Sequence, residues 1–426
     1  MKFIYADAMD FVDPGFDFAT DRNAEGRIVQ WDDEYPHEFL ELAPYDGILV
    51  SRGIVGDVQH QGKYTLPQMM RFRREGARKF LRYSEQTFPG SLLFGDCGAF
   101  TYRNQKVPPY KPADTVKFYA DGGFTHGCSV DHIIFDFDEG LGRPREEMSQ
   151  DTLDRYSLTL ELAAEFFVES KRLRGFTPMG VIQGWSAPSM AWAASQLVHM
   201  GYDYLAVGGL VPLNVSQIHS ALAAIRDAIP SRVRLHLLGF GKIEHLAEFE
   251  RYGVASFDTT SPLLRAFKDA TKNYFARDAE GELSYYTAIR VPQARDNNKL
   301  KAKSRRGVLH QETAMQLEAS ALEAIRSNVA GKMEMDKALD HILAYWKALN
   351  WREDDDEGMQ RRALLKQREI YRRTLKDQPW RGCGCRVCRE AGVETLLFRS
   401  SNRNKRRGMH NLHVFYQHLL AHRLSA

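Results

Sequence analysis

The chain has 426 residues, of which 43% are hydrophobic, and this is enough for a large buried core and for one to three domains. Its five cysteines, three of them in one cluster, are too few for a secreted disulfide framework, and no apolar stretch approaches the roughly 18 residues that cross a membrane. The N-terminal sequence MKFIYADAMDF carries acidic residues early and has no apolar signal segment. We therefore expect a cytoplasmic protein with no membrane partner.

The formal net charge of +3 is unevenly distributed along the chain. Residues 299–426 contain 26 Lys and Arg against 15 Asp and Glu, a balance of +11, whereas the preceding residues have a balance of −8. A basic C-terminal part on an acidic body indicates a polyanionic partner, such as a nucleic acid. The alternative is that these basic runs only solvate a surface.

From residue 46 to residue 294, short apolar runs alternate with amphipathic segments. The runs have the length, the composition and the flanking glycines of strands. They are DGILVSRG (46–53), SLLFGDCG (91–98), DHIIFDFD (131–138), MGVIQG (179–184), YLAVGGL (204–210), RLHLLGFG (234–241), ASFDTTSP (255–262) and LSYYTAIRV (283–291). Eight strands with helices between them predict an α/β fold, a (β/α)₈ TIM barrel over residues 46–294.

The alternative fold is a doubly wound open sheet, which favours a glycine-rich phosphate loop after its first strand. The segment SRGIVGDVQHQG is a poor loop of this kind, so the barrel is preferred. Residues 1–45 contain one short apolar run, KFIYADAM, and are otherwise rich in Asp and Pro. We expect them to decorate the barrel. Residues 295–380 are charged, poor in glycine and helical in period, and predict a helical insertion of two to four helices.

The last segment, residues 381–426, contains a cluster typical of a zinc-binding subdomain. Cys383, Cys385 and Cys388 form a C-x-C-x-x-C motif, and His410 follows. Three thiolates and one imidazole complete a tetrahedral Zn²⁺ site and leave no position for a water, which indicates a structural metal. His413 is an alternative fourth ligand. The chemistry is therefore expected upstream of this cluster.

In TIM barrels the active site lies at the C-terminal ends of the strands. Several carboxylates follow the predicted strands, and like charges that converge on one rim raise the pKa of one another. Each of them alone can be a helix N-cap, and the glycine pair can serve a tight turn instead of a ligand. The strand-end residues are Asp96, Asp136, Asp138, Glu139, Gln183, Gly208, Gly209, Gly239, Gly241 and Asp258.

Seven short motifs in one order resemble those of the tRNA-guanine transglycosylases. They are FGDCGAFTY (94–102), DFDEG (136–140), GVIQG (180–184), AVGGL (206–210), LLGFG (237–241), GVASFDTTSP (253–262) and the cysteine cluster with HNLHVFY (410–416). Members of this family exchange guanine for a 7-deazaguanine on a (β/α)₈ barrel that carries a structural zinc. The resemblance implies that Asp258 is the nucleophile, which forms a covalent intermediate with the sugar, and that Asp96 is the general acid/base.

The same resemblance implies the residues that bind the base. Asp138 is expected to accept hydrogen bonds from the N1–H and 2-amino edge of a guanine-like ring, and Phe100 to stack on its face. The ordinary alternative for Phe100 is packing within the barrel. The 6-oxo group is expected to contact Gln183 and the AVGGL segment, which contains Gly208, Gly209 and Leu210.

The chain departs from the tRNA enzymes where they hold their polynucleotide. Cys97, Ala99 and Thr101 replace a serine, a glycine and a glutamine, and SPLLRAFKDA follows Asp258 in place of a segment that contacts tRNA. This pattern resembles the DNA-modifying DpdA branch, which implies DNA and free 7-cyano-7-deazaguanine (preQ0) as substrates, with helper proteins of a DNA-modification system as further partners.

The alternatives to this reading are tRNA as the polymer, and a non-catalytic relative that only binds nucleic acid. Three basic stretches are expected to contact the phosphate backbone. They are KLKAKSRR (299–306), RRALLKQREIYRR (361–373) and NRNKRR (402–407).

Overall fold

In the computed structural model, which describes residues 1–138, 144–351 and 355–425, the chain forms two compact units. The first unit contains residues 1–9 and 45–261, and the second contains residues 10–44 and 262–426. The break after residue 44 lies within one residue of the predicted boundary at residue 45, and the break after residue 261 lies ahead of the predicted boundaries at residues 294 and 380. The segment 1–45, expected to decorate the barrel, is shared between the two units.

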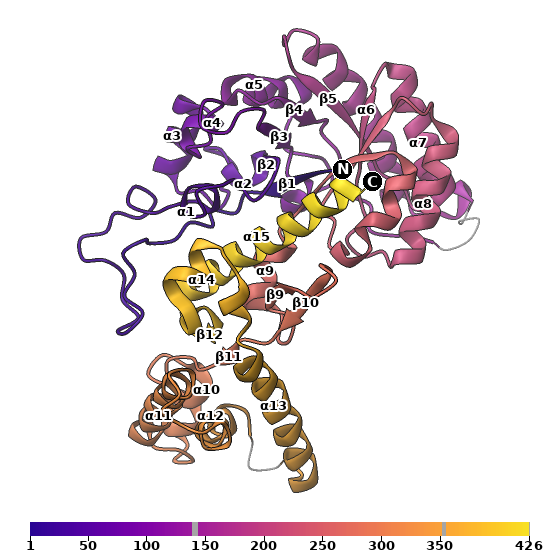
Figure 1. Cartoon of the computed structure of the whole chain (residues 1–426). Coiled ribbons are helices and arrows are strands. Elements are labelled where there is room, and N and C mark those ends of the chain that lie inside the picture. The colour runs from indigo at the N-terminus through magenta and orange to yellow at the C-terminus, as the bar shows by residue number, and fades with distance from the viewer. Residues whose placement is uncertain (139–143, 352–354, 426) are drawn as a thin grey trace. The chain divides into compact units, whose positions relative to one another are not determined.

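The first unit is a closed barrel of eight parallel strands in sequence order, in which the last strand pairs with the first (Figure 1). This arrangement confirms the predicted (β/α)₈ fold and excludes the open sheet. The strands are β1 (Lys2–Ala6), β2 (Gly47–Ser51), β3 (Leu92–Asp96), β4 (His126–Cys128), β5 (Thr177–Ile182), β6 (Tyr204–Val207), β7 (Arg234–Leu237) and β8 (Val254–Thr259).

Two of the eight predicted barrel strands are wrong, and two strands of the barrel were not predicted. The barrel begins with β1, from the run that was expected to be decoration, because its apolar residues are buried between β2 and β8. The fourth strand is the short segment 126–128, and the predicted strand 131–138 has no regular structure. The run 283–291 lies outside the barrel, in the second unit, where it forms two short strands.

Helices follow most of the barrel strands. Several begin with a residue that satisfies the first free backbone N–H groups: Ser149 accepts from the N–H of Thr152, and Asn214 accepts from the N–H of Gln217. The helical elements of the barrel unit are α2 (Arg52–Val55), α3 (Leu66–Glu75), α4 (Ala77–Phe80), η1 (Ala99–Tyr102), α5 (Pro112–Gly122), η2 (Arg145–Glu147), α6 (Gln150–Ser170), α7 (Ala187–Met200), α8 (Val215–Ala228) and η3 (Ile243–Tyr252).

Glycines in β3 and β4 let one helix pack closely on the sheet. A Cβ atom at Gly95 would lie 2.2 Å from the ring of Tyr119 in α5, and one at Gly127 would lie 2.5 Å from the same ring. The hydroxyl of Tyr119 donates to the carbonyl of Cys128 at 3.0 Å. The short strand β4 is therefore held from outside by a buried aromatic ring as well as by its neighbouring strands.

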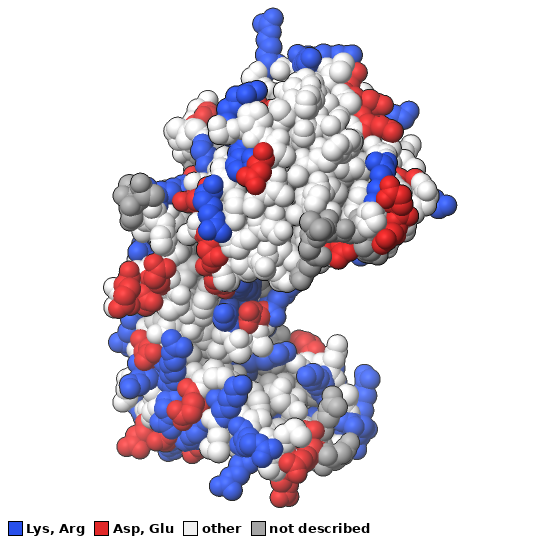
Figure 2. Space-filling view, turned by 90° about the vertical axis from the view of Figure 1, so that its right-hand side faces the viewer, with Lys and Arg blue, Asp and Glu red and all other residues white. Residues whose placement is uncertain are grey.

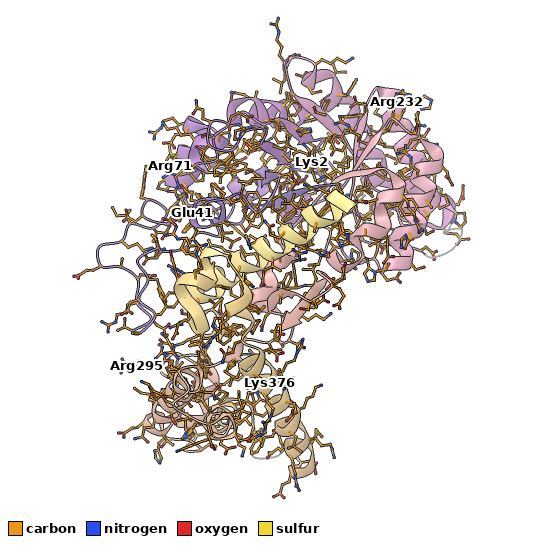
Figure 3. The ribbon with its side chains drawn as sticks, in the orientation of Figure 1. Lys2, Glu41, Arg71, Arg232, Arg295 and Lys376 are labelled. Atoms are coloured by element: carbon orange, nitrogen blue, oxygen red, sulfur yellow. The ribbon has the colours of Figure 1, made fainter. Side chains whose placement is uncertain are left out.

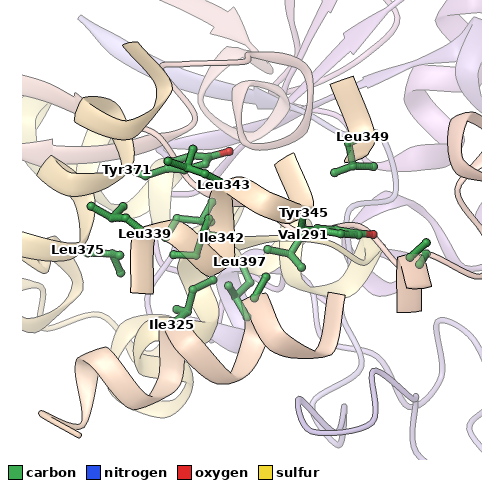
Figure 4. Packing of buried hydrophobic residues seen from close by; sticks show 14 of the residues in the cluster. Val291, Ile325, Leu339, Ile342, Leu343, Tyr345, Leu349, Tyr371, Leu375 and Leu397 are labelled. Carbon is green, nitrogen blue, oxygen red and sulfur yellow. The ribbon is translucent and has the colours of Figure 1, made fainter. Parts of the chain in front are cut away.

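The second unit contains the predicted helical segment, which begins after Arg295 and ends near Lys376 (Figure 3). It consists of four helices, α10 (Asn298–Arg305), α11 (Gln311–Val329), α12 (Met335–Asn350) and α13 (Glu357–Asp377). Their buried core contains Ile325, Leu339, Ile342 and Tyr371, and Leu397 of the following segment packs into it (Figure 4).

The rest of the second unit surrounds the cysteine cluster. A hairpin of β9 and β10 lies ahead of the helical segment, and the long helix α15 ends the chain (Figure 1). The elements are α1 (Pro36–Phe39), α9 (Ser261–Lys268), β9 (Tyr274–Arg277), β10 (Leu283–Tyr286), β11 (Ile289–Arg290), η4 (Pro379–Gly382), α14 (Arg386–Ala391), η5 (Gly392–Leu396), β12 (Leu397–Phe398) and α15 (Ser401–Ser425).

Candidate active site

A cavity of about 340 Å³ opens in the barrel unit at the C-terminal ends of the strands. Four carboxylates line it together, those of Asp7, Asp96, Asp131 and Asp258, each supplied by a different strand end or by the loop that follows. Among the lining residues are Ser51, Asp96, Phe100, Asp131, Gln183, Gly208, Gly209, Gly239 and Asp258. The cavity therefore gathers six of the eight residues that were predicted to carry catalysis or base binding.

Asp258, on β8, is 5% exposed and is held on one side only. Its Oδ1 accepts a hydrogen bond from the backbone N–H of Gly239 at 3.0 Å and lies 3.2 Å from Nε2 of His236. Among the described residues, no hydrogen bond reaches Oδ2. One oxygen of this carboxylate is thus anchored and the other is available to the cavity.

Asp96 ends β3 and is partly exposed, toward the cavity that it lines. Burial raises the pKa of the Asp96 carboxyl to about 7, and the charges of Asp131 and Asp258 add to this effect. Hydrogen bonds from the Ser51 hydroxyl and from the backbone N–H of Gly98 (3.0 Å) oppose the shift. A carboxyl with this pKa exchanges a proton readily near neutral pH, as a general acid/base requires.

Asp131 is a further carboxylate of the cavity, and the strand-end motifs do not predict it. Its Oδ1 accepts from the thiol of Cys97 at 3.0 Å, and its Oδ2 accepts from Nε2 of Gln183 at 2.7 Å. Burial raises the pKa of Asp131, and it also raises that of the Cys97 thiol, which is therefore a neutral donor. The predicted strand 131–138 contains Asp131 and therefore hides it. Asp131 in fact follows the end of β4 at residue 128, and a strand predicted at 126–128 would have marked it as a strand-end carboxylate.

Gln183 is 2% exposed and is fixed by two hydrogen bonds. It donates to Asp131, and its Oε1 accepts from the backbone N–H of Ile134 at 3.3 Å. Gly208 leaves the space that Gln183 needs, because a Cβ atom there would lie 2.4 Å from the amide nitrogen. Gly209 has a φ of +72°, a left-handed conformation that favours glycine.

Two predicted base-binding residues do not line the cavity. The backbone N–H of Asp138 donates to the carbonyl of Trp185 at 2.8 Å, and Leu210 is 2% exposed in the barrel core. Glu139 and Gly140 of the same motif lie outside the described residues. Phe100 lines the cavity with 55% of its surface exposed, and its ring contacts that of Phe135 edge to face.

The second unit contains a cluster of metal-ligand type. Cys383, Cys385, Cys388 and His410 have donor atoms that all lie within 4.8 Å of one another. The three Sγ atoms lie 3.5, 3.4 and 3.3 Å from Nδ1 of His410. A tetrahedral zinc with Zn–S of about 2.3 Å and Zn–N of about 2.0 Å would separate sulfur from nitrogen by about 3.5 Å, so the donor set fits this ion.

The imidazole of His410 is oriented from its other side. Its Nε2 contacts the carbonyl of Phe275 at 2.8 Å, and the ring stacks on Tyr274. This is the usual outer contact of a metal-binding histidine, and it directs Nδ1 at the sulfurs. His413, the alternative ligand, is not part of the cluster.

Comparison with known proteins gives the family. The chain is 39% identical over 424 residues to the DNA-guanine transglycosylase of Salmonella montevideo, covering 98% of this chain and 96% of that protein. The chain belongs to the tRNA-guanine transglycosylase family. It is an enzyme of the transglycosylase class, as its motifs predicted.

More distant members of the family match a smaller part of the chain. The queuine tRNA-ribosyltransferase of Thioalkalivibrio sulfidiphilus is 30% identical over 154 residues, 35% of this chain and 38% of that enzyme. That of Chromohalobacter salexigens is 27% identical over 164 residues, 37% of this chain and 40% of that enzyme. A search of protein-family models gave no match.

One of the three basic stretches predicted to bind phosphate is buried. In the transglycosylase, Arg403, Arg406 and Arg407 of NRNKRR are 1%, 2% and 0% exposed. Arg407 donates to the carbonyls of Thr395 and Leu397, and the other two bind the segment 10–44. The prediction that this run contacts a phosphate backbone is therefore wrong.

The other two basic stretches present exposed side chains, among them Lys299, Arg305, Arg306, Arg361 and Arg362. On the face shown in Figure 2, many Lys and Arg side chains lie over the part of the molecule that contains α10–α13, and Asp and Glu side chains lie among them. Within the described residues, no helix combines the length and the apolar character that a membrane crossing requires.

Proposed function

We propose that this transglycosylase exchanges guanine for 7-cyano-7-deazaguanine in DNA through a covalent aspartyl-glycosyl intermediate. The observation that carries the chemistry is the pair of carboxylates in one cavity, Asp258 with a free Oδ2 and Asp96 with a pKa near 7. The choice of DNA is supported by the full-length match to a protein named as a DNA-guanine transglycosylase, since the tRNA enzymes match about a third of the chain.

In the first half of the reaction, Oδ2 of Asp258 attacks C1′ of the nucleotide. The C1′–N9 bond breaks, and its electron pair remains on guanine, which takes a proton from Asp96. Burial raises the pKa of the Asp96 carboxyl to about 7, so its protonated form is available near neutral pH. Guanine leaves as a neutral base, and the sugar stays bound to Asp258 as an ester.

The second half reverses these steps with the new base. Asp96, now ionised, takes the proton from N9 of the entering 7-deazaguanine, and the N9 electron pair attacks C1′. The bond between C1′ and Oδ2 breaks, and its electron pair returns to Asp258. Both aspartates regain their first states, so the exchange consumes no other reactant. The target nucleotide must leave the base stack before attack, as in other base-modifying enzymes.

The cavity suggests a different base-reading carboxylate from the predicted one. Asp131 lines the cavity beside Gln183, whereas Asp138 does not. A guanine-like ring presents two neighbouring donors, N1–H and the 2-amino group, and a carboxylate accepts both. We assign Asp131 this role, with Gln183 and the Gly209 N–H directed at the 6-oxo group and Phe100 stacked over the ring.

Zn²⁺ is the ion that Cys383, Cys385, Cys388 and His410 would hold. Bound there, the metal would crosslink the second unit and would take no part in the reaction, since four protein ligands would leave no position for a water.

The deciding experiment offers labelled 7-cyano-7-deazaguanine with either DNA or tRNA. The DNA set includes a duplex with one unpaired guanine, so that the reaction does not depend on a separate opening activity. We expect label in DNA alone, and none with Asp258→Ala that folds normally. Label in tRNA alone would show that tRNA, and not DNA, is the substrate. Label in neither polymer would favour a non-catalytic protein that only binds nucleic acid.

A further inference from the structure

A line of buried polar side chains runs through the barrel interior to Asp258. The hydroxyls of Tyr204 (β6) and Ser256 (β8) lie 2.5 Å apart, and the Ser256 hydroxyl lies 2.5 Å from Nδ1 of His236 (β7). Nε2 of His236 then lies 3.2 Å from Oδ1 of Asp258. Tyr204, Ser256 and His236 are 3%, 1% and 0% exposed, so none of these contacts is shared with bulk water.

The register of the strands builds this line. Ser256 and Asp258 are two residues apart on β8 and therefore face the same side of the sheet. His236 on β7 pairs with Ser256, and a register shift follows Leu235 at this point. The His236 ring packs against Phe94 with its centroid 5.2 Å away, which fixes the plane of the imidazole.

One set of proton positions satisfies every group. The Tyr204 hydroxyl donates to Ser256, the Ser256 hydroxyl donates to Nδ1 of His236, and Nε2–H of His236 donates to Asp258. These positions follow from the network, because each oxygen and nitrogen then has a partner of the right kind. Oδ1 thereby receives two donors, from His236 and from the Gly239 backbone, and Oδ2 receives none among the described residues.

An apolar side chain at position 236 would fill the same volume without burying two ring nitrogens. Burying polar groups costs free energy unless they are hydrogen-bonded, and here the hydrogen bonds lead to the carboxylate of the cavity. The alternative is a buried histidine satisfied only for stability. That role explains the contact with Ser256, but it does not require that the second nitrogen be directed at Asp258.

We propose that His236 is a positioning residue for the nucleophile. It holds Oδ1 so that Oδ2 faces C1′, and it stabilises the carboxylate that is released when the ester bond breaks. This inference rests on the proposed role of Asp258. His236 keeps its proton throughout: the bond that forms and breaks is C1′–Oδ2, and the electron pair moves between the sugar and Asp258.

The consequence is a shift in the equilibrium between the ester and the free enzyme. Donors to Oδ1 favour the ionised carboxylate over the neutral ester, so removal of one donor favours the ester. A hydrogen bond to a charged group contributes enough for a change of about 10- to 100-fold in this equilibrium. A residue that only supports the fold would lower the amount of active enzyme and leave the equilibrium unchanged.

The test measures covalent enzyme–DNA complex after denaturation, at increasing concentrations of added guanine. Free guanine reverses the ester, and the concentration that halves the complex reports the equilibrium independently of the active fraction. His236→Phe, which keeps a ring and removes the donor, should raise this concentration at least tenfold. His236→Gln, which can donate to Asp258, should stay within about threefold of the wild type.

His236→Asn provides the matched variant if the phenylalanine does not fold. Its amide can still pair with Ser256 but is too short to reach Asp258, so it should behave like His236→Phe. His199→Phe, at an exposed histidine of α7, should leave the midpoint unchanged. If folded His236→Phe or His236→Asn has the same half-maximal guanine concentration as the wild type, the role of His236 is overturned and that of Asp258 is unaffected. Absence of any complex with the wild type would remove the role of Asp258 and the inference together.

Discussion

Arg403 and Asp21 are 382 positions apart in the sequence and form a buried ion pair, with Nε 2.6 Å from Oδ1. Both belong to the second unit, and both side chains are almost fully buried. Arg403 also contacts Glu394 and the carbonyl of Phe18. This arginine therefore ties the segment 10–44 to the C-terminal helix.

Substitution of Arg403 should destabilise the protein without a direct effect on DNA binding. Arg403→Ala removes one of the two guanidinium groups that bind the buried Asp21 carboxylate, and the loss of a hydrogen bond to a charged group costs about 1.5–3 kcal/mol. Urea unfolding should show this loss, and binding of DNA by the remaining folded protein should be unaffected. Normal stability together with weaker DNA binding would instead restore the phosphate-contact interpretation.

The exposed arginines at the C-terminal end of α10 are the better candidates for DNA contact. Arg305 and Arg306 are both exposed, and each phosphate neutralised by a side chain contributes about one to the slope of log affinity against log salt. The double variant Arg305→Ala, Arg306→Ala should bind DNA more weakly, to a similar extent for all sequences, and its slope should fall by about 2. Arg232→Ala, at an exposed barrel position, serves as control, and an equal effect there would contradict the assignment.

Sequence patterns predicted most of the barrel strands but missed β4 and the burial of the arginines in α15. Alternation of apolar runs with amphipathic segments predicted the barrel because six of its strands lie within continuous apolar runs. β4 was missed since its three residues include a glycine and a histidine, which do not resemble a strand. The run 402–407 was misread because composition alone does not distinguish exposed from buried charge; the spacing of Arg403, Arg406 and Arg407 on one helix face was the available signal.

The candidate site shows the same limit. Asp96, Gln183 and Asp258 were predicted from short motifs at strand ends, which a barrel brings to one rim. Asp131 and His236 were not singled out, because their importance depends on which side chains meet across strands. Such contacts depend on strand register, which short motifs do not specify.

Removal of a metal ligand should unfold part of the second unit. His410→Ala or Cys385→Ser should lose the bound metal, since the cluster then has three donors, and should lower the thermal stability of the protein. His413→Ala should retain one metal per chain. Metal content by elemental analysis, with limited proteolysis of the same samples, checks both. Loss of metal from the His413 variant alone would exchange the roles of the two histidines.

A methyl group at Gly208 should weaken base binding while the barrel remains folded. The Cβ of Gly208→Ala would lie 2.4 Å from the Gln183 amide nitrogen, so Gln183 must move away from Asp131. We expect the KM for the free base to rise roughly tenfold or more. The reason is that the hydrogen bond from Gln183 to the Asp131 carboxylate, a bond to a charged group that contributes about 1.5–3 kcal/mol, is lost. Gly241→Ala, where the nearest atom is 3.8 Å away, is the matched control.

Asp96 should make the protein less stable as the pH rises. Its folded pKa of about 7 exceeds the reference value of 3.8, so the folded state retains a proton that the unfolded state releases. The free energy of unfolding therefore falls as the pH rises from about 4 to about 7. Above pH 7 the decrease caused by ionisation of Asp96 in the folded state is complete. Asp96→Asn cannot ionise and should be more stable than the wild type at pH 8, by at most about 4 kcal/mol.

The pH dependence distinguishes this effect from a simple change in packing. The gain of Asp96→Asn should shrink toward zero near pH 4, where the wild-type carboxyl is also protonated. Urea unfolding at pH 4, 6 and 8 checks it, with Asp154→Asn, at an exposed position of α6, as control. A gain of equal size at all three pH values would show that Asp96 does not titrate near neutrality. The acid/base role would then need another group, because an Asp96 that is fully ionised at neutral pH has no proton to give to the departing guanine.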